Sequence, residues 1–358
     1  MKGSDRSTGL AANVEYPFDR PVILLAAPRS GSTLLFETLA KSQDFWTIGG
    51  ESHAIFESIR QFSPQSGICD SNALYAADAT AEVIAQIRAS FLDQLRNAQG
   101  IRYRGAPDHA APRFLEKTPK NAVRVSLLNE IFPDALFVYL YRNPRENISS
   151  MIDAWHSGRF VTYRRLPGRN APWSLLLPPG WQQHHASSIA QIAAFQWRAA
   201  NTAILQELAK VGADRWTAVS YGQQVHAPIE TVRRLCRFCD VSADGIVASL
   251  SEHGLKPSRY TLTKPEPDKW QKNAQALLDV LPGLAETVRF IRELAPGLPE
   301  EEFDLRIDPE LTAPGRDMAV EGHGAELETV RRNERCHCGS GKRFKHCHGD
   351  PRLAGAAR

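Results

Sequence analysis

The chain has 358 residues and a net charge of +3 that divides into −3 over residues 1–330 and +6 over residues 331–358, so the body lacks the basic surface of a nucleic-acid-binding protein. Hydrophobic residues make up 42% of the sequence, six cysteines are too few for a disulfide scaffold, and no apolar run is long enough to span a membrane. Residues 1–13 are polar and contain no signal-peptide core, so we expect a cytoplasmic protein without a membrane span.

The first predicted elements are a strand, a turn and the start of a helix. Residues 22–26 are continuously apolar, as a strand buried on both faces requires. Leucines at helical spacing follow a turn that contains one glycine and three hydroxyls: Gly31, Ser30, Ser32 and Thr33. Backbone N–H groups and a helix N-terminus would converge on an anion there, so the segment predicts a phosphate-binding loop.

This loop differs from the loop of the nucleoside triphosphatases, G-x-x-x-x-G-K-[ST], at its most diagnostic position. Ala26 stands at the first glycine, and Ser32 stands where a lysine would reach the β- and γ-phosphates. The loop is therefore expected to bind a nucleotide through its 5′-phosphate rather than a γ-phosphate. A P-loop kinase or other nucleotide-dependent phosphotransferase is the first alternative, and it would need that lysine and a Mg²⁺ site.

A second buried strand is followed by a helix. Residues 137–141 are apolar, Asn143 can cap the helix, and Glu146 stands at the capping-box position. Arg142 lies at the end of the strand and Ser150 two turns into the helix. Both side chains can therefore meet at one phosphate.

Residues 157–186 carry aromatic side chains among several arginines, including Phe160, Tyr163, Trp173 and Trp181. This composition is unlike a solvated linker and is typical of an ordered lid. We expect the segment to contact a substrate through apolar and aromatic side chains.

The C-terminal tail carries the second strong motif. Two thiols in C-x-C and a Cys-His pair, separated by a G-S-G turn, provide four metal ligands: Cys336, Cys338, Cys347 and His348. This donor set suits a tetrahedral structural Zn²⁺ with no open position. A segment this short cannot bury a core, so the metal would supply most of its folding free energy, about 10–16 kcal/mol by analogy with zinc fingers.

We therefore predict an α/β protein with a P-loop-like parallel sheet flanked by helices, plus a small C-terminal zinc-binding module. Residues 1–17 are assigned to an N-terminal extension and residues 18–310 to the α/β domain. Pro, Gly and charged residues without periodicity predict a linker over residues 311–333, and the zinc motif occupies residues 334–352.

The loop P-R-S-G-S-T together with Arg142 and Ser150, eight residues apart, resembles the sulfotransferases that use 3′-phosphoadenosine 5′-phosphosulfate (PAPS). The similarity is greatest to the branch of tyrosylprotein and bacterial sulfotransferases, and it extends over most of residues 18–305. It implies that Arg29 and the loop residues after it hold the 5′-phosphosulfate. It also implies that Arg142 and Ser150 hold the 3′-phosphate.

The same resemblance implies roles for further residues. Lys117 stands at the lysine of the K-[TD]-P segment, which contacts the leaving-group oxygen, and Glu51 stands at the G-E pair that supplies the base. Ser258 and Lys264 match an S-x5-K spacing near the cofactor. A proline replaces the histidine that acts as base in cytosolic sulfotransferases, which leaves Glu51 or His53 as the predicted base.

The implied function is transfer of a sulfuryl group from PAPS to a hydroxyl or phenol by in-line displacement. The acceptor can be a lipid, a glycan, a peptide tyrosine or a small alcohol, and the sequence does not choose among them.

The tail resembles the SEC-C motif, best known at the C-terminus of the preprotein-translocase motor ATPase. Its basic side chains, Lys342, Arg343 and Lys345, are expected to contact an acidic protein partner. A non-catalytic interaction protein that works through this zinc tail is the second alternative. Such a protein would have lost Lys117 or Arg142, and both are present.

Overall fold

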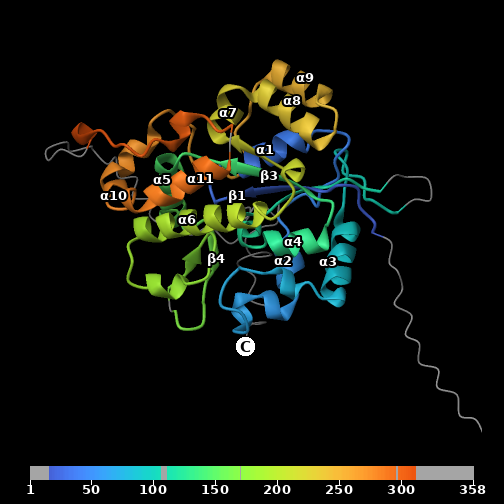
Figure 1. Ribbon diagram of the computed structural model, residues 1–358, viewed down its shortest axis with the longest axis horizontal. Coiled ribbons are helices and arrows are strands. Elements are labelled where there is room, and N and C mark those ends of the chain that lie inside the picture. Colours follow the sequence, from blue (N-terminus) through green and yellow to red (C-terminus); the bar gives the residue numbers. More distant parts are fainter. Residues whose placement is uncertain (1–15, 106–110, 170, 296, 312–358) are drawn as a thin grey trace, which may run out of the picture. The chain divides into compact units, whose positions relative to one another are not determined.

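The computed structural model describes residues 16–105, 111–169, 171–295 and 297–311 (Figure 1). The predicted zinc motif, the linker after Leu311 and the N-terminal extension before residue 16 lie outside the described residues. All residues predicted for the phosphate loop, the PAPS site and the base lie within them.

A four-stranded parallel sheet forms the core of the described structure (Figure 1). Its strand order is β2 (Leu115–Lys117), β1 (Val22–Ala26), β3 (Leu136–Tyr141) and β6 (Trp216–Ser220). The two central strands pair from Val22 opposite Leu136 to Ala26 opposite Leu140. Every residue of β1 and β3 is buried, which confirms the two strands predicted from continuous apolar runs.

Helices connect the strands and continue beyond the last one. In chain order they are α1 (Ser32–Leu39), α2 (His53–Glu57), α3 (Ala81–Gln94), α4 (Val125–Ile131), α5 (Pro144–His156), α6 (Ile189–Leu208), α7 (Tyr221–His226), α8 (Pro228–Cys239), α9 (Asp244–His253), α10 (Ala274–Leu278) and α11 (Ala285–Leu294). A separate antiparallel hairpin consists of β4 (Val161–Tyr163) and β5 (Trp173–Ser174). None of the helices in the described ranges is long and apolar enough to cross a membrane.

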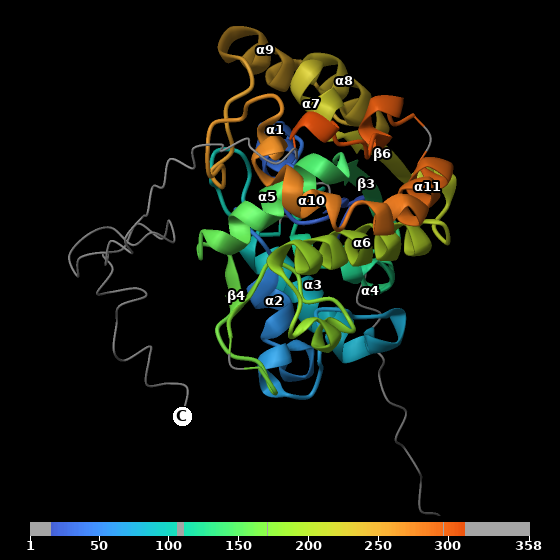
Figure 2. The same ribbon diagram turned by 90° about the vertical axis from the view of Figure 1, so that its left-hand side faces the viewer.

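Helices cover both faces of the sheet because alternate residues of a strand point to opposite faces. Val22, Leu24 and Ala26 belong to a buried cluster with side chains of α1, α8 and α9. Ile23 and Leu25 belong to the other cluster, with side chains of α4 and α6. Figures 1 and 2 show α8 and α9 on one side of β3 and α6 on the other. The result is the predicted parallel sheet flanked by helices.

The turn after β1 adopts a left-handed conformation, with φ of 65° at Arg29 and 93° at Gly31. A Cβ atom at Gly31 would lie 2.5 Å from Cδ2 of Tyr221, so glycine is required both for the backbone angle and for the close approach. The strand, turn and helix predicted for this segment are confirmed.

The helix predicted after the second strand is α5, and it begins at Pro144. Asn143 caps it as predicted, because its side-chain oxygen accepts a hydrogen bond of 2.9 Å from the N–H of Arg145. The capping box predicted for Glu146 is wrong. Its carboxylate pairs instead with the guanidinium of Arg142, four residues earlier, at 3.0 Å.

Candidate active site

A cavity of about 770 Å³ is lined by residues that directly follow β1, β3 and β6. The carboxyl ends of these parallel strands meet at one edge of the sheet, which is where ligands bind in open α/β sheets. The cavity wall contains most of the residues predicted for the site: Arg29, Gly31, Ser32, Thr33, Glu51, His53, Arg142, Ser150 and Ser258.

The N-terminus of α1 faces this cavity. No side chain caps the helix, and its first two residues, Ser32 and Thr33, both line the cavity wall. The first N–H groups of an α-helix have no partner within the helix, and the helix dipole makes this end positive. An anion is therefore the ligand that this end of the helix favours.

The hydroxyl of Ser30 is used inside the loop instead. It lies 2.8 Å from the carbonyl oxygen of Ala27 and 2.8 Å from Oδ1 of Asn147. Asn147 also donates through Nδ2 to the carbonyl oxygen of Pro28, at 2.8 Å. Ser30 is buried and is not part of the cavity wall, so its side chain shapes the phosphate loop together with Asn147.

Two arginines converge on the cavity. Arg29 donates through Nη1 to the carbonyl oxygen of Tyr260 at 3.1 Å, and its guanidinium lies 4.5 Å from the ring centroid of Phe160. Its Nε is buried without a partner in the described part of the chain. The Arg142 guanidinium lies 4.2 Å from the ring centroid of Tyr221 and donates to the carbonyl oxygen of Arg29 at 3.2 Å. Burial, with the nearby charge of Arg142, lowers the pKa of Arg29 to about 10.

Ser150 and Ser258 line the cavity as predicted, whereas Lys264 does not. Ser150 on α5 lines the cavity together with Arg142, and Ser258 lines it from the segment after α9. Lys264 is exposed and is not part of the cavity wall. Its carbonyl oxygen accepts a hydrogen bond of 3.2 Å from Nζ of Lys269, and Lys269 does line the cavity.

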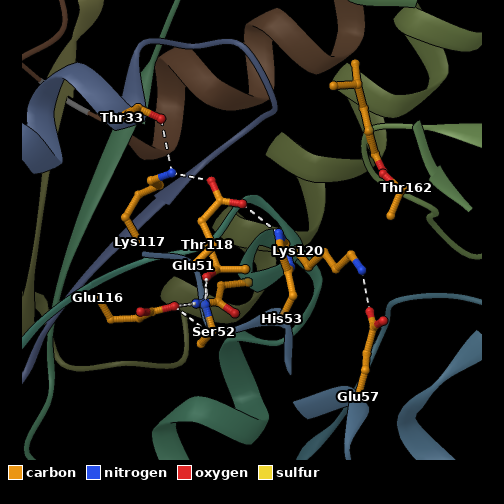
Figure 3. Close-up of polar contacts among 12 residues, drawn as sticks. Thr33, Glu51, Ser52, His53, Glu57, Glu116, Lys117, Thr118, Lys120 and Thr162 are labelled. Atoms are coloured by element: carbon orange, nitrogen blue, oxygen red, sulfur yellow. Dashed lines mark hydrogen bonds and ion pairs between the residues drawn. The ribbon is translucent and has the colours of Figure 1, made fainter. Parts of the chain in front are cut away.

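Lys117 joins the phosphate loop to the predicted bases (Figure 3). The ammonium of this residue, at the end of β2, donates to Oγ1 of Thr33 at 3.1 Å and forms an ion pair with Glu51. The second carboxylate oxygen of Glu51 lies 2.6 Å from Nε2 of His53. The structure therefore brings the three residues predicted for catalysis into one hydrogen-bonded chain.

The ionisation of this chain follows from its contacts. Burial raises the pKa of Glu51, but the hydrogen bond from His53 and the charge of Lys117 outweigh burial and lower the pKa to about 2. Burial lowers the pKa of His53 against the opposing effect of Glu51, so we assign a neutral ring whose Nε2 carries the proton that faces the carboxylate. Nδ1 of His53 is buried and has no partner within the described ranges. Glu51 and His53 both line the cavity, but the Nδ1 lone pair of His53 is buried.

Two contacts to β2 and the residue after it fix the position of Glu51. The N–H of the next residue, Ser52, donates to Oγ1 of Thr118 at 2.7 Å, and the Ser52 hydroxyl donates to Oε1 of Glu116 at 2.6 Å (Figure 3). Asn121 donates to the same Glu116 oxygen at 3.1 Å. Ser52, Glu116, Thr118 and Asn121 are all buried, so this hydrogen-bonded network supports the position of Glu51 beside Lys117.

The predicted lid over residues 157–186 forms part of the cavity wall. It contributes the apolar residues Phe160, Val161, Leu175 and Leu176, and also Arg159 and Thr162. The segment is ordered as predicted, because β4 and β5 pair within it.

Only part of the predicted lid reaches the cavity. Trp173 and Trp181 are buried with Tyr163 and Leu177 in a separate cluster and are not part of the cavity wall, whereas Phe160 is. The ring centroids of Trp173 and Trp181 lie 5.5 Å apart. The lid therefore has a small apolar core of its own.

A second ion pair, Glu57 with Lys120, completes the wall beside His53 (Figure 3). Nζ of Lys120 lies 2.9 Å from Oη of Tyr163, which donates to Oε1 of Glu57 at 2.9 Å. Burial lowers the pKa of Lys120 to about 8, and Glu57 acts against this effect. The two charges compensate each other, so this wall offers polar groups without a net charge.

Sequence analysis missed several of these residues. Tyr221 directly follows the strand β6. A position after the carboxyl end of a parallel strand indicates a ligand site, and this was the sequence signal that could have identified it. Asn147 lies between Arg142 and Ser150 in the sequence, but no local pattern indicates that its side chain contacts the phosphate loop. Glu57 and Lys120 pair across 63 positions of the sequence, a separation for which local patterns give no signal.

Comparison with known proteins assigns the family. Residues 21–245 match the profile of the Sulfotransferase family, and residues 332–350 match the SEC-C motif. The first match covers more than half of the chain and includes the phosphate loop, Lys117 and Arg142. The chain therefore belongs to the Sulfotransferase family.

Among its relatives, a protein-tyrosine sulfotransferase of Drosophila melanogaster is 26% identical over 304 residues, which cover 82% of this chain and 54% of the relative. Protein-tyrosine sulfotransferase A of Caenorhabditis elegans is 25% identical over 240 residues, covering 66% and 54%. The chain thus spans about half the length of these curated relatives. In the tail, the protein translocase subunit SecA of Burkholderia multivorans is 57% identical over 35 residues, which cover 10% of this chain and 4% of that subunit.

Solved sulfotransferase structures are also similar. One from Alicyclobacillus acidocaldarius covers 82% of this chain and 100% of its own, with 14% identity and a TM-score of 0.44. A mouse sulfotransferase complexed with PAP, 3′-phosphoadenosine 5′-phosphate, covers 77% and 88%, with 12% identity and a TM-score of 0.40. Within the described ranges, no group of three or more His, Cys, Asp or Glu is arranged to hold a metal ion.

The ion pair of Glu51 predicts a pH-dependent contribution to stability. A pKa lowered from 4.5 to about 2 stabilises the folded protein above the unfolded value, and this contribution is lost as the pH falls toward 2. Its size is on the order of 3 kcal/mol. Glu51→Gln should therefore reduce the free energy of unfolding, measured in urea, more at pH 7 than at pH 3. Glu130→Gln, an exposed control, should show no such difference, and an equal effect of Glu51→Gln at both pH values would contradict the assignment.

Proposed function

We propose that this protein transfers a sulfuryl group from PAPS to the hydroxyl or phenol oxygen of an acceptor. The observation that carries the proposal is the convergence of an anion-binding loop, two arginines and an ion-paired carboxylate on one cavity. Membership of the Sulfotransferase family supports it. The site also lacks the loop lysine that a nucleoside triphosphate requires, because Ser32 stands in its place.

The residues present fit PAPS. Arg29 has a buried Nε without a partner in the described structure, and no side chain caps the N-terminus of α1. Both features suit a site that receives an anionic group. Arg29 and the N-terminus of α1 would hold the 5′-phosphosulfate, and Arg142 with Ser150 would hold the 3′-phosphate. Ser258, in the segment after α9, would contact the same cofactor.

When bound, PAPS supplies an electrophilic sulfur and a phosphate leaving group. Lys117 is buried and does not itself line the cavity, but Thr33 and Glu51, which it contacts, do. These two contacts use two of its three ammonium N–H groups, and the third would meet the negative charge that develops on the leaving oxygen. Glu51 accepts the proton of the attacking hydroxyl. A carboxylate with so low a pKa takes this proton only as the hydroxyl becomes acidic during attack, so deprotonation and S–O bond formation are coupled. His53 orients Glu51 through its Nε2–H.

The lid side of the cavity supports a neutral acceptor with an apolar body. Phe160, Leu175 and Leu176 offer apolar surface, and the charges of Glu57 and Lys120 compensate each other. This ion pair therefore contributes no net charge that would select a charged acceptor. We therefore propose an alcohol or phenol on an apolar or aromatic body.

We further propose that the chain carries an α/β sulfotransferase domain over residues 18–310 and a zinc module over residues 334–352. The match to the SEC-C motif over residues 332–350 supports this division. Cys336, Cys338, Cys347 and His348 form a donor set that suits structural Zn²⁺. The basic side chains between them would contact an acidic protein.

Transfer of radioactive sulfur tests the proposed activity. The protein is incubated with ³⁵S-labelled PAPS and a panel of neutral phenols and alcohols, matched with carboxylated and aminated analogues of each. Label is expected on the neutral acceptors first. Phosphate transfer from γ-labelled ATP to the same panel, without sulfuryl transfer, would support the kinase alternative instead.

Arg142→Ala should weaken binding of PAP far more than binding of adenosine 5′-monophosphate, which lacks only the 3′-phosphate. One charge-assisted contact is worth about 1.5–3 kcal/mol, so the Kd for PAP should rise by roughly 10- to 100-fold in calorimetry. Arg198→Ala, an exposed arginine on α6, is the matched control. Equal weakening of both nucleotides would remove Arg142 from the 3′-phosphate site.

Glu51→Gln should lower kcat by roughly 10²- to 10⁴-fold without weakening PAP, because it removes the base but leaves Lys117 free to meet the nucleotide. Lys117→Ala should lower kcat and also weaken PAP. His53→Ala should reduce kcat less than Glu51→Gln, since it removes only an orienting contact. Near-normal turnover by Glu51→Gln together with loss of turnover by His53→Ala would make His53 the base.

Removal of residues 331–358 should abolish zinc content while leaving the PAP affinity and the Tm of the remaining chain unchanged, if the tail is an independent module. Elemental analysis of the full chain, purified without chelators, should give one Zn²⁺ per chain. Absence of zinc would reject the metal site. A truncated chain that no longer folds would reject the proposed independence.

A further inference from the structure

The segment after α11 crosses the carboxyl ends of β3 and β6 and places a buried carboxylate between them. Glu302, in the single 3₁₀ turn Glu300–Phe303, accepts hydrogen bonds from two backbone N–H groups. Oε2 accepts from Asn143 at 3.1 Å, and Oε1 accepts from Gly222 at 2.9 Å. Glu302 lies beyond residues 21–245, the part of the chain that matches the Sulfotransferase family.

The two N–H groups belong to the residues that follow Arg142 and Tyr221, both of which line the cavity. β3 and β6 are parallel neighbours, with Tyr141 opposite Ser220, so these two N–H groups lie side by side. A Cβ atom at Gly222 would lie 2.3 Å from Oε1 of Glu302. An alanine at position 222 would therefore force the Glu302 carboxylate to shift from its contact with the two N–H groups.

Tyr221 connects the Glu302 carboxylate to the proposed cofactor site. Its ring lies where a Cβ of Gly31 would be, in contact with the phosphate loop. The guanidinium of Arg142 lies 4.2 Å from the centroid of the same ring. A change in the backbone at Tyr221 therefore displaces the loop and the arginine together.

Neighbouring contacts hold Glu302 in place. The Tyr141 hydroxyl donates to the carbonyl oxygen of Glu302 at 3.2 Å, and the Asn143 side chain donates to the carbonyl oxygen of Asp304 at 3.1 Å. The ring of Phe303 lies 5.5 Å from that of Tyr141. Burial of a carboxylate is costly unless it is hydrogen-bonded. The two N–H contacts, together with a hydrogen bond to the Ser220 side chain, offset this cost.

We infer that Glu302 is a positioning residue, which holds Arg142 and Tyr221 in the geometry that receives the 3′-phosphate of the nucleotide; the inference rests on the proposed function. Glu302 is not part of the cavity wall, so it acts through these two residues. The 3₁₀ turn that carries it thereby belongs to the cofactor site, although it follows β3 by some 160 positions.

Glu302→Gln tests this inference, because glutamine keeps one acceptor oxygen and turns an NH₂ group toward the second N–H. Calorimetry on the full chain is expected to show a rise of about tenfold or more in the Kd for PAP and a smaller rise for adenosine 5′-monophosphate. Gly222→Ala, which disturbs the same contact from the other strand, should have the same selective effect. Glu301→Gln, the exposed neighbour with the same change of charge, should leave both Kd values unchanged.

The binding stoichiometry separates a positioning role from a merely structural one. Loss of folded protein lowers the number of binding sites per chain but not the affinity of those that remain. Unchanged Kd values for PAP in Glu302→Gln, or an equal rise for both nucleotides, would overturn the inference while leaving the proposed function intact. Failure of the unaltered protein to bind PAP would instead reject the proposed function.

Discussion

The ring of Tyr221 lies so close to Gly31 that no side chain fits between them, and this contact fixes the distance between the phosphate loop and the end of β6. Arg142 packs against the same ring from the end of β3. Because the strands are parallel neighbours, residues that are far apart in the sequence meet at one edge of the sheet. The cofactor site is thus built from strand ends, and its geometry depends on a position that only glycine can occupy.

Charge is distributed unevenly in the cavity. Around the proposed nucleotide site, Arg29 and Arg142 lie close together; Arg142 pairs with Glu146, and the buried Nε of Arg29 has no partner in the described residues. Around the proposed acceptor site, Lys117 and Lys120 are paired with Glu51 and Glu57. This arrangement supports the proposal of an anionic nucleotide and a neutral acceptor. Lys117 stands at the boundary, where it contacts both the phosphate loop and the base.

Sequence patterns predicted the parts of the site that are local. Continuous apolar runs identified β1 and β3, and the residues immediately after them, the loop around Gly31 and Arg142, proved to line one cavity. Family resemblance added Lys117, Glu51 and His53, which no local pattern would have connected. The contacts that were not predicted are long-range: Asn147 to the phosphate loop, and Glu302 to two strand ends. Lys264 is exposed and lies outside the cavity wall, because a six-residue spacing in an irregular segment does not fix the direction of a side chain.

The central claim is that the cavity is built for a 3′-phosphorylated adenine nucleotide rather than for a nucleoside triphosphate. Calorimetric titration of the full chain with PAP and, separately, with ATP in the presence of Mg²⁺ tests it most directly. We expect one PAP site per chain with a Kd at least about 100-fold lower than that for ATP, since the 3′-phosphate adds charge-assisted contacts and no loop lysine meets a γ-phosphate. Equal or tighter binding of ATP would contradict it.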